Sequence, residues 1–332
     1  MESNLNWPYI SVIIITKNRY ESLYEAVDSI LRCDYPQDRY EIIILEETNV
    51  PRPIIKTNVH YKTIPVCNRG FGYARNKAVS LSNYNLLAFT DDDCIVDRDW
   101  LKMLASTIMQ NESLVAVAGA VLLPKCKNIG KCENILGFPG GGLWRVHISN
   151  GAVMEVDTIS TCNCMIKKET LLALGGFDES LVFGGEDELL SQRLRKRGKM
   201  VFSPRAKVYH KPRDSWLKIW KWFIRRGRAE WTLRQIQGIV KSPLFNFIVS
   251  SPYFRFIVII TLLFLFTNSI FGTFLFCGVL FFCYYFILLY RYSWSLRYKG
   301  YFIALLLVPL VRVWMDMAYH AGFLMEMYKQ KK

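Results

Sequence analysis

Three short, strongly apolar runs alternate with helical patterns in the first hundred residues. The runs are "YISVIIITKN" (9–18), "YEIIILEETN" (40–49) and "NLLAFTDDD" (85–93), and the helical patterns are "RYESLYEAVDSILRC" (19–33) and "GYARNKAVSLS" (72–82). Continuous apolar runs are typical of strands that are buried on both faces of a parallel sheet. Their alternation with helices predicts an α/β domain that is Rossmann-like, with a mainly parallel sheet flanked by helices.

Polar and acidic residues follow each predicted strand. They are Thr16, Lys17, Asn18, Glu46, Glu47, Asp91, Asp92 and Asp93. Ligands of such sheets bind at the carboxyl ends of the strands, so we expect these side chains to converge on one crevice. Carboxylate oxygens suit Mg²⁺ or Mn²⁺, and such an ion usually keeps positions for substrate phosphates. The alternative is a polar turn whose acids cap the helix predicted by "DRDWLKMLA" (97–105).

The composition indicates which kinds of partner the chain is expected to bind, and several kinds fit. The chain has 332 residues, 52% of them hydrophobic, and a formal net charge of +14. A basic excess of this size predicts anionic partners, which include phosphates, nucleic acid and an acidic membrane surface. The 9 cysteines show no zinc-site spacing, which favours reduced thiols, and the first residues show no signal-peptide pattern.

The final third of the chain has a different character. "SWLKIWKWFIRRGRAEW" (215–231) predicts a basic, tryptophan-rich amphipathic helix suited to a membrane interface, with ordinary packing on the α/β core as the alternative. Residues 254–290 carry one charge, Arg255, and are too long for one untilted span. They are just long enough for two short spans that turn near 267–269 or at Gly272.

Basic residues on both sides of this apolar run favour a hairpin that keeps both flanks cytoplasmic. The later run "YFIALLLVPLV" (301–311) is short for a span, which favours an interfacial or re-entrant helix. The expected regions are an α/β domain, amphipathic interfacial helices, a transmembrane hairpin, and an interfacial helix with a basic tail. Their bounds are 1–213, 214–250, 251–292 and 293–332.

Five segments, in order, resemble motifs of the family-2 glycosyltransferases of the GT-A fold. They are "SVIIITKNRYESLYEAVDSIL" (11–31), "NRGFGYARNKAV" (68–79), "FTDDDCIVDRDWL" (89–101), "CMIKKETLLALGGFDE" (164–179) followed by "GGEDELLSQRLRKRG" (184–198), and "AKVYH" (206–210). The resemblance covers about residues 9–210, and five ordered motifs are far more specific than one. It implies an inverting, metal-dependent transferase that takes a sugar from a nucleotide-sugar donor.

The resemblance also implies roles for single residues around the metal. Asp93, with Asp91, would bind the Mg²⁺ or Mn²⁺ that bridges the donor diphosphate. Asp92 would face the sugar or the ribose. His210, which ends the last motif, would be a further ligand of the metal or of the diphosphate.

For the nucleotide, the resemblance implies contacts from Thr16 and Arg75. Glu46 or Glu47 stands where the family usually has aspartates that hydrogen-bond the base. The longer side chain leaves the identity of the base open, UDP included.

Asp187 is the residue expected to act as the base. Transfer to a hydroxyl needs a group that accepts the acceptor proton, and the resemblance places Asp187 there, with Glu186 the next candidate. Acids in a first helical turn also stabilise the helix dipole, which is the structural alternative.

Other functions fit the sequence less well. A polyprenyl-phosphate glycosyltransferase needs no base, because its acceptor is already ionised, so "GGED" (184–187) argues against it. A processive polysaccharide synthase would add a Gln-x-x-Arg-Trp motif, which the sequence lacks. A catalytically inactive, membrane-anchored nucleotide-sugar binder conflicts with the intact carboxylate set.

A nucleic-acid-binding protein is the last alternative. The basic residues gather near the apolar segment and no recognition motif is found, so anionic membrane lipids explain the charge better than nucleic acid. The sequence therefore predicts a glycosyltransferase on the cytoplasmic face of a membrane. Its acceptor would be a hydroxyl of a membrane-borne glycan or a lipid-linked sugar, which the anchor would bring to the crevice.

Overall fold

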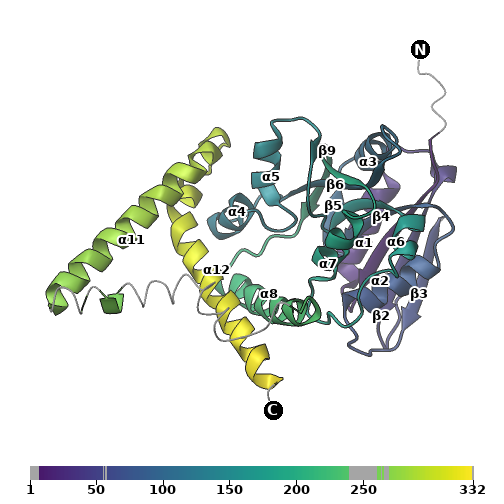
Figure 1. Ribbon diagram of the computed structural model, residues 1–332. Helices are drawn as coiled ribbons and strands as arrows, with labels where there is room; N and C mark the ends of the chain where they lie inside the picture. Colours follow the sequence, from purple (N-terminus) through teal and green to yellow (C-terminus); the bar gives the residue numbers. More distant parts are fainter. Residues whose placement is uncertain are drawn as a thin grey trace. The chain divides into compact units, whose positions relative to one another are not determined.

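The computed structural model describes residues 7–54, 56, 58–238, 260–262, 264 and 269–330. The chain divides into two compact units, Met1–Arg213 and Asp214–Lys332 (Figure 1). We call them the α/β unit and the helical unit.

The α/β unit is built on one nine-stranded sheet in the order β3-β2-β1-β4-β8-β6-β9-β5, with β7 paired to β9. The strands are β1 (Ile10–Thr16), β2 (Tyr40–Glu47), β3 (Val59–Ile64), β4 (Leu86–Asp91), β5 (Cys94–Val96), β6 (Leu114–Leu122), β7 (Met154–Glu155), β8 (Asn163–Lys167) and β9 (Lys199–His210). The pairs among β3, β2, β1 and β4 are parallel, as is β6 with β9. The pairs of β8 with β4 and β6, and of β9 with β5 and β7, are antiparallel.

Helices cover both faces of this sheet. They are α1 (Tyr20–Leu31), α2 (Phe71–Ser80), α3 (Trp100–Ile108), α4 (Asn128–Ile135), α5 (Gly142–Ser149), α6 (Lys168–Ala173) and α7 (Glu186–Leu194), with a short 3₁₀ turn η1 (Gln37–Arg39). Along β1, Val12 and Ile14 join the core that contains α1 and α3, whereas Ile13 joins the core that contains α2, α6 and α7. Side chains of a strand alternate between the faces, so a strand covered on both sides is apolar throughout.

The predicted α/β class and the elements named from the sequence are confirmed. The sheet is parallel only in the half formed by β3, β2, β1 and β4, and it is mixed beyond β4. An apolar run reports burial on two faces and carries no information on strand direction, which explains the difference. The glycine-rich stretch 137–144 connects α4 to α5 and enters α5.

The helical unit contains α8 (Trp216–Ile236), α11 (Ile270–Tyr292), the 3₁₀ turn η2 (Ser293–Arg297) and α12 (Phe302–Lys329). The buried face of α8 repeats every four residues, at Ile219, Phe223, Gly227 and Trp231. This face packs against α12, where the Trp231 and Phe323 ring centroids lie 5.2 Å apart.

Two glycines allow the backbones of α8 and α12 to approach closely. A Cβ atom at Gly227 would lie 1.9 Å from the Tyr319 carbonyl oxygen, and one at Gly322 would lie 2.0 Å from the Ile224 carbonyl oxygen. Any side chain at either position would therefore push the two helices apart. The predicted amphipathic helix is present with α12 as a packing partner, and its contact with a membrane interface stays a prediction.

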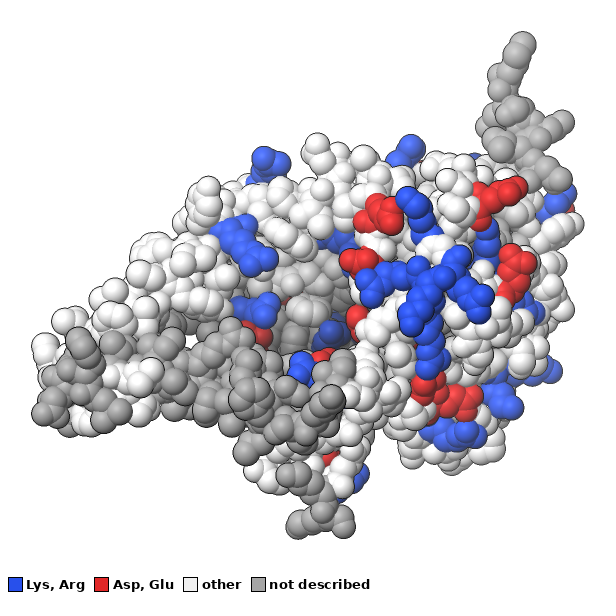
Figure 2. All heavy atoms as spheres, in the orientation of Figure 1, with Lys and Arg blue, Asp and Glu red and all other residues white. Residues whose placement is uncertain are grey.

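Within the described part of the chain, two helical segments are long and apolar enough to cross a membrane, Phe271–Arg297 and Phe302–Lys329. Figure 2 shows that charged side chains are spread over the α/β unit, whereas the outer part of α11 is drawn without them. These helices are consistent with a C-terminal membrane anchor.

The predicted hairpin falls partly outside the described residues, which omit 239–259, 263 and 265–268. A turn at Gly272 is wrong, because Gly272 lies in the first turn of α11, where its N–H donates to the Ser269 hydroxyl over 3.1 Å.

The predicted short helix at 301–311 is longer than expected. It continues through Arg312, which pairs with Asp316 one turn later over 2.9 Å. An i,i+4 ion pair lets charged residues continue a helix. The interfacial or re-entrant placement of α12 at the membrane stays a prediction.

Candidate active site

The ends of three neighbouring strands lie level with one another. In the parallel register, Thr16 of β1 pairs with Glu46 of β2, and Ile15 pairs with Asp91 of β4. The acids that follow β4 therefore lie at the same edge of the sheet as Thr16 and the glutamates, as the sequence predicts.

Asp93 and His210 meet because β5 and β9 pair next to them, with Cys94 opposite His210. His210 Nε2 lies 3.3 Å from Asp93 Oδ1, and His210 Nδ1 lies 2.8 Å from the Lys211 carbonyl oxygen. A carbonyl oxygen can only accept, so Nδ1 carries the proton of the neutral ring. Nε2 then presents a lone pair toward a carboxylate, an arrangement that a cation between them would stabilise.

The donor atoms of Asp91, Asp93, Cys94 and His210 all lie within 4.8 Å of one another. Burial raises the pKa of the Cys94 thiol well above its ordinary value, and the nearby Asp91 adds to this effect. Hard cations such as Mn²⁺ and Mg²⁺ prefer carboxylate oxygens, whereas cysteine sulfur suits softer metals. The remaining set of two carboxylates and one imidazole fits a divalent cation such as Mn²⁺ or Mg²⁺.

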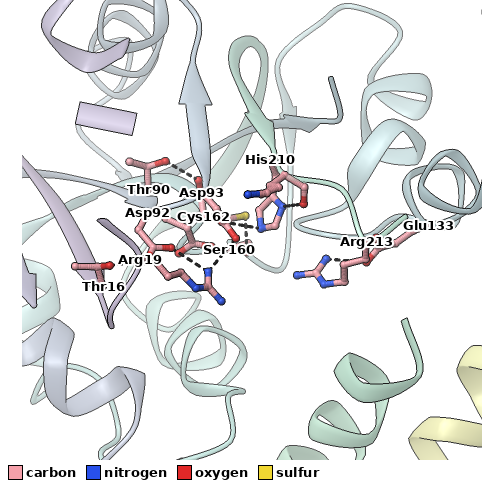
Figure 3. A network of polar contacts seen from close by, with 12 residues as sticks. Thr16, Arg19, Thr90, Asp92, Asp93, Glu133, Ser160, Cys162, His210 and Arg213 are labelled. Carbon is pink, nitrogen blue, oxygen red and sulfur yellow. Dashed lines mark hydrogen bonds and ion pairs between the residues drawn. The ribbon is translucent and has the colours of Figure 1, made fainter. Parts of the chain in front are cut away.

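Asp92 points to the other side of this cluster (Figure 3). The Thr16 hydroxyl donates to Asp92 Oδ2 over 2.6 Å, and Arg19 Nη1 donates to Asp92 Oδ1 over 3.1 Å. Burial raises the pKa of Asp92 to about 6, against the lowering effects of Thr16 and Arg19. Arg19 Nη1 also donates to Asp93 Oδ2 over 3.0 Å, so one guanidinium joins the two aspartates.

Arg75 connects the aspartates to the start of α7. It is buried, lies 3.7 Å from Asp91 Oδ1, and makes a short ion pair with Glu186. Burial raises the pKa of both Asp91 and Glu186, and Arg75 opposes the rise in each. A buried arginine shared by two buried carboxylates is costly to break, because removing it leaves uncompensated charge.

Asp187 is the more accessible of the two acids that begin α7. Its side chain is partly exposed, whereas Glu186 is 4% exposed and held by Arg75. Asp187 acts electrostatically on both Arg75 and Asp91, so it lies within range of the aspartates of β4. The structure thus gives the pair two different environments. Glu186 is buried and held by Arg75, whereas Asp187 is partly exposed and its Oδ1 accepts from the Glu188 N–H over 2.9 Å.

α2 holds the segment before α7 in place. Asn76 Nδ2 donates to the Phe177 carbonyl oxygen over 2.9 Å, and the Phe177 N–H donates to Asn76 Oδ1 over 2.9 Å. At Gly72 a Cβ would lie 2.5 Å from the Asp178 carbonyl oxygen, so glycine is required for this approach. The segment that contains "ARN" (74–76) therefore positions Glu186 through Arg75 and the 176–178 turn through Asn76.

The two glutamates that end β2 are already bonded within the protein. The Tyr61 hydroxyl donates to Glu46 through a short hydrogen bond. Glu47 Oε1 accepts from the Cys67 and Asn68 N–H groups, each over 2.8 Å, and from Lys17 over 3.2 Å. Burial alone would raise the pKa of Glu47, but these three donors hold it below its ordinary value. Glu47 thus fastens the loop before α2 to the sheet, and a contact of either glutamate with a base stays a prediction.

Arg19 is the site residue that the sequence analysis did not select. It follows β1 by three residues, inside the "TKNR" (16–19) segment at the same strand end as Thr16. Ligands bind at the carboxyl ends of strands, so the position of Arg19 just after β1 could have indicated its role. Lys17, which belongs to the predicted strand end, reaches Glu47 and Asn68.

Two family models match the chain. The model of Glycosyl transferase family 2 matches residues 11–122, and that of Glycosyl transferase family 21 matches residues 75–327, which is more than half of the chain. The first match contains the strand ends with Thr16, the glutamates and the aspartates. The second contains Arg75, the acids of α7 and His210.

Relatives and solved structures agree with this. A glucosyl-dolichyl phosphate glucuronosyltransferase of Haloferax volcanii is 25% identical over 61% of this chain and 69% of its own length. A poly-beta-1,6-N-acetyl-D-glucosamine synthase of Staphylococcus epidermidis is 25% identical over 70% of this chain and 58% of its own length, so the chain spans under two thirds of that relative.

A mannosyltransferase from Pyrobaculum calidifontis, solved with GDP-Man and Mn²⁺, has 15% identity and a TM-score of 0.60. That match covers 98% of this chain and 88% of the other, and at this identity it shows the fold alone. The chain therefore belongs to Glycosyl transferase family 21, shares the family 2 match over residues 11–122, and is an enzyme of glycosyl transfer built on the GT-A fold.

Proposed function

We propose that the chain is an inverting, metal-dependent glycosyltransferase at the cytoplasmic face of a membrane. It would move a sugar from a nucleotide-sugar donor to a hydroxyl of a membrane-borne glycan or lipid-linked acceptor. The observation that carries the proposal is the cluster of Asp91, Asp93 and His210, whose oxygens and nitrogen converge at one strand end.

On the donor side, Asp91, Asp93 and His210 would hold a Mn²⁺ or Mg²⁺ ion. When bound, the ion supplies charge compensation for the leaving diphosphate. Asp92 is oriented by Thr16 and Arg19, and its carboxylate would receive a hydroxyl of the sugar or the ribose. The mannosyltransferase of similar fold was solved with a nucleotide-sugar and Mn²⁺, which supports this class of donor.

On the acceptor side, Asp187 would take the proton of the attacking hydroxyl. A base must be reachable by the acceptor, and Asp187 is partly exposed while Glu186 is buried and held by Arg75. Arg75 therefore orients the start of α7 and leaves Asp187 as the more accessible carboxylate. Attack on the face opposite the leaving diphosphate inverts the anomeric centre.

The two apolar helices of the helical unit support an acceptor that is itself bound to the membrane. The Haloferax relative is named for action on a glucosyl-dolichyl phosphate, which is a lipid-linked sugar. Anionic lipids would attract the basic residues near these helices. A sugar hydroxyl, in contrast to a lipid phosphate, gives Asp187 a proton to accept.

The test is a screen of nucleotide-sugars with Mn²⁺ or Mg²⁺, because many transferases slowly hydrolyse their own donor. Release of the nucleoside diphosphate from one donor identifies the substrate. The anomeric configuration of the transferred sugar is then read by proton NMR on a product made with a lipid-linked acceptor. Release from no donor, or a product that retains the donor configuration, contradicts the proposal.

A further inference from the structure

Asp93 has both of its oxygens engaged by cationic or ionisable side chains. Oδ1 faces His210 Nε2 at 3.3 Å, and Oδ2 accepts from Arg19 Nη1 at 3.0 Å. Because His210 is itself a predicted metal ligand, Arg19 on Oδ2 is the partner that competes with a metal ion for Asp93. Figure 3 shows Arg19 and His210 on different sides of Asp93.

The two partners differ in how easily they can leave. The His210 side chain is 5% exposed, whereas that of Arg19 is 57% exposed. Arg75, the other arginine near the aspartates, is also buried, with 7% of its side chain exposed. Arg19 is thus the cation in this group that can swing away without unpacking the core.

The backbone of Arg19 is fixed independently of its side chain. Its carbonyl oxygen accepts from the Leu23 N–H over 2.9 Å at the start of α1, and its side chain makes no capping bond there. The guanidinium can therefore change partner while the strand end and α1 stay in place. For the same reason, Arg19→Ala is expected to fold.

A guanidinium on Asp93 opposes a divalent cation at the same carboxylate, because like charges repel and the Arg19 bond to Asp93 competes with the cation. A donor diphosphate brings new negative charge to this edge, and arginine binds phosphate oxygens in bidentate geometry. Arg19, once released from Asp93, would then have the donor diphosphate as its new anionic partner.

We propose that Arg19 occupies Asp93, one of the metal-binding aspartates, together with Asp92 when the donor is absent, and transfers to the donor diphosphate when metal and donor bind. Arg19 is in this account a positioning residue that couples the two binding events. Metal alone binds weakly, and metal with diphosphate binds tightly. The inference rests on the metal-dependent function proposed above and adds to it the order and coupling of binding.

The test measures Mn²⁺ affinity on the full chain in detergent, by the EPR signal of free Mn²⁺. Arg19→Ala should bind Mn²⁺ alone about tenfold more tightly than wild type, since the competing cation at Asp93 is removed. Arg19→Lys, which keeps the charge, should stay within about threefold of wild type by the same scale. Arg195→Ala is the matched control, because Arg195 is similarly exposed and pairs with Asp157 away from these aspartates.

The second arm adds inorganic pyrophosphate as the diphosphate probe at saturating Mn²⁺. Its affinity should fall by about tenfold in Arg19→Ala and stay unchanged in Arg195→Ala. Unchanged or weaker Mn²⁺ binding by Arg19→Ala overturns the competition, and undiminished pyrophosphate affinity overturns the transfer. If wild type and all variants fail to bind Mn²⁺, the metal assignment falls together with the inference; if wild type binds and Arg19→Ala does not differ, the inference alone falls.

Discussion

The α/β unit and the helical unit handle charge in opposite ways. In the α/β unit, Asp91, Asp92 and Asp93 are concentrated at one strand end, with Arg19, Arg75 and His210 around them. In the helical unit, Arg228 pairs with Glu326, and Arg312 with Asp316, along the helices.

Carboxylates concentrated at a strand end create a site for a cation. Burying their charge is unfavourable, and burial accordingly raises the pKa of Asp91. In the helical unit, each of these charged residues is instead paired with a residue of opposite charge. From this contrast we expect the α/β unit to carry the chemistry and the helical unit the anchoring. A substitution that impairs one unit should then leave the function of the other unit intact.

The largest effect is expected from Asp93→Ala. This change removes a predicted metal ligand, so transfer should fall by about 10³-fold or more, the scale of lost electrostatic stabilisation of a leaving group. Mn²⁺ binding should be lost as well. Turnover and Mn²⁺ affinity are measured together, with Asp99→Asn as control, because Asp99 lies on the same segment and its side chain makes no capping bond.

A somewhat smaller effect is expected from Asp187→Asn. It keeps the shape of the side chain and removes its basicity, so kcat should fall by about 10²-fold while donor affinity stays close to wild type. Glu188→Gln, which is exposed on the same first turn of α7, should leave kcat unchanged.

The same pair of variants separates a base from a helix-stabilising acid. A lost interaction with the helix terminus costs about 1 kcal/mol of stability, which would lower the melting temperature and leave turnover of the folded fraction intact. An Asp187→Asn enzyme that melts early and turns over normally would show that the base lies elsewhere, with Glu186 to be tested next.

In the helical unit, Gly322→Ala should lower stability without touching the chemistry. Its Cβ would meet the Ile224 carbonyl oxygen at the crossing of α8 and α12, and overpacking of this kind costs about 1–3 kcal/mol. The melting temperature in detergent should fall, while Mn²⁺ affinity stays unchanged. Gly278→Ala in α11 is the matched control, since its Cβ would meet nothing within 4 Å. A loss of Mn²⁺ affinity in Gly322→Ala would refute the separation of the two units.

The smallest perturbation is a topology experiment, which changes no residue of the enzyme. Reporters fused after Trp231 and after Lys332 should both read cytoplasmic, because an even number of crossings keeps the basic flanks on one side. Reporters on opposite sides would show an odd number of crossings and rule out the hairpin with an interfacial α12.

Strand ends were the most predictable part of the site. Thr16, Asp91 and Asp93 could be placed together from the sequence because parallel strands end at one edge, and the register of β1 with β4 confirms it. His210 could be added only through the resemblance, since the β5–β9 pairing that brings it to Asp93 joins segments over a hundred residues apart.

Side-chain partners were not predictable in the same way. The sequence shows that Arg75 and Glu186 belong to two motifs, but only the structure shows that they form one buried ion pair. Arg19 was missed because a basic residue in a basic chain carries little information until its partners are known. The direction of β8 and the length of α12 were likewise hidden, because apolar runs report burial and say little about direction or where a helix stops.

The most direct test of the central claim is removal and return of the metal once the donor is known. Enzyme treated with a chelator is assayed for transfer, and Mn²⁺ or Mg²⁺ is then added back in excess. We predict that transfer falls to background with the chelator and returns with the metal in wild type and in Asp99→Asn, and that it does not return in Asp93→Ala. Full transfer by chelator-treated wild type would contradict the assignment of Asp91, Asp93 and His210 as a metal site.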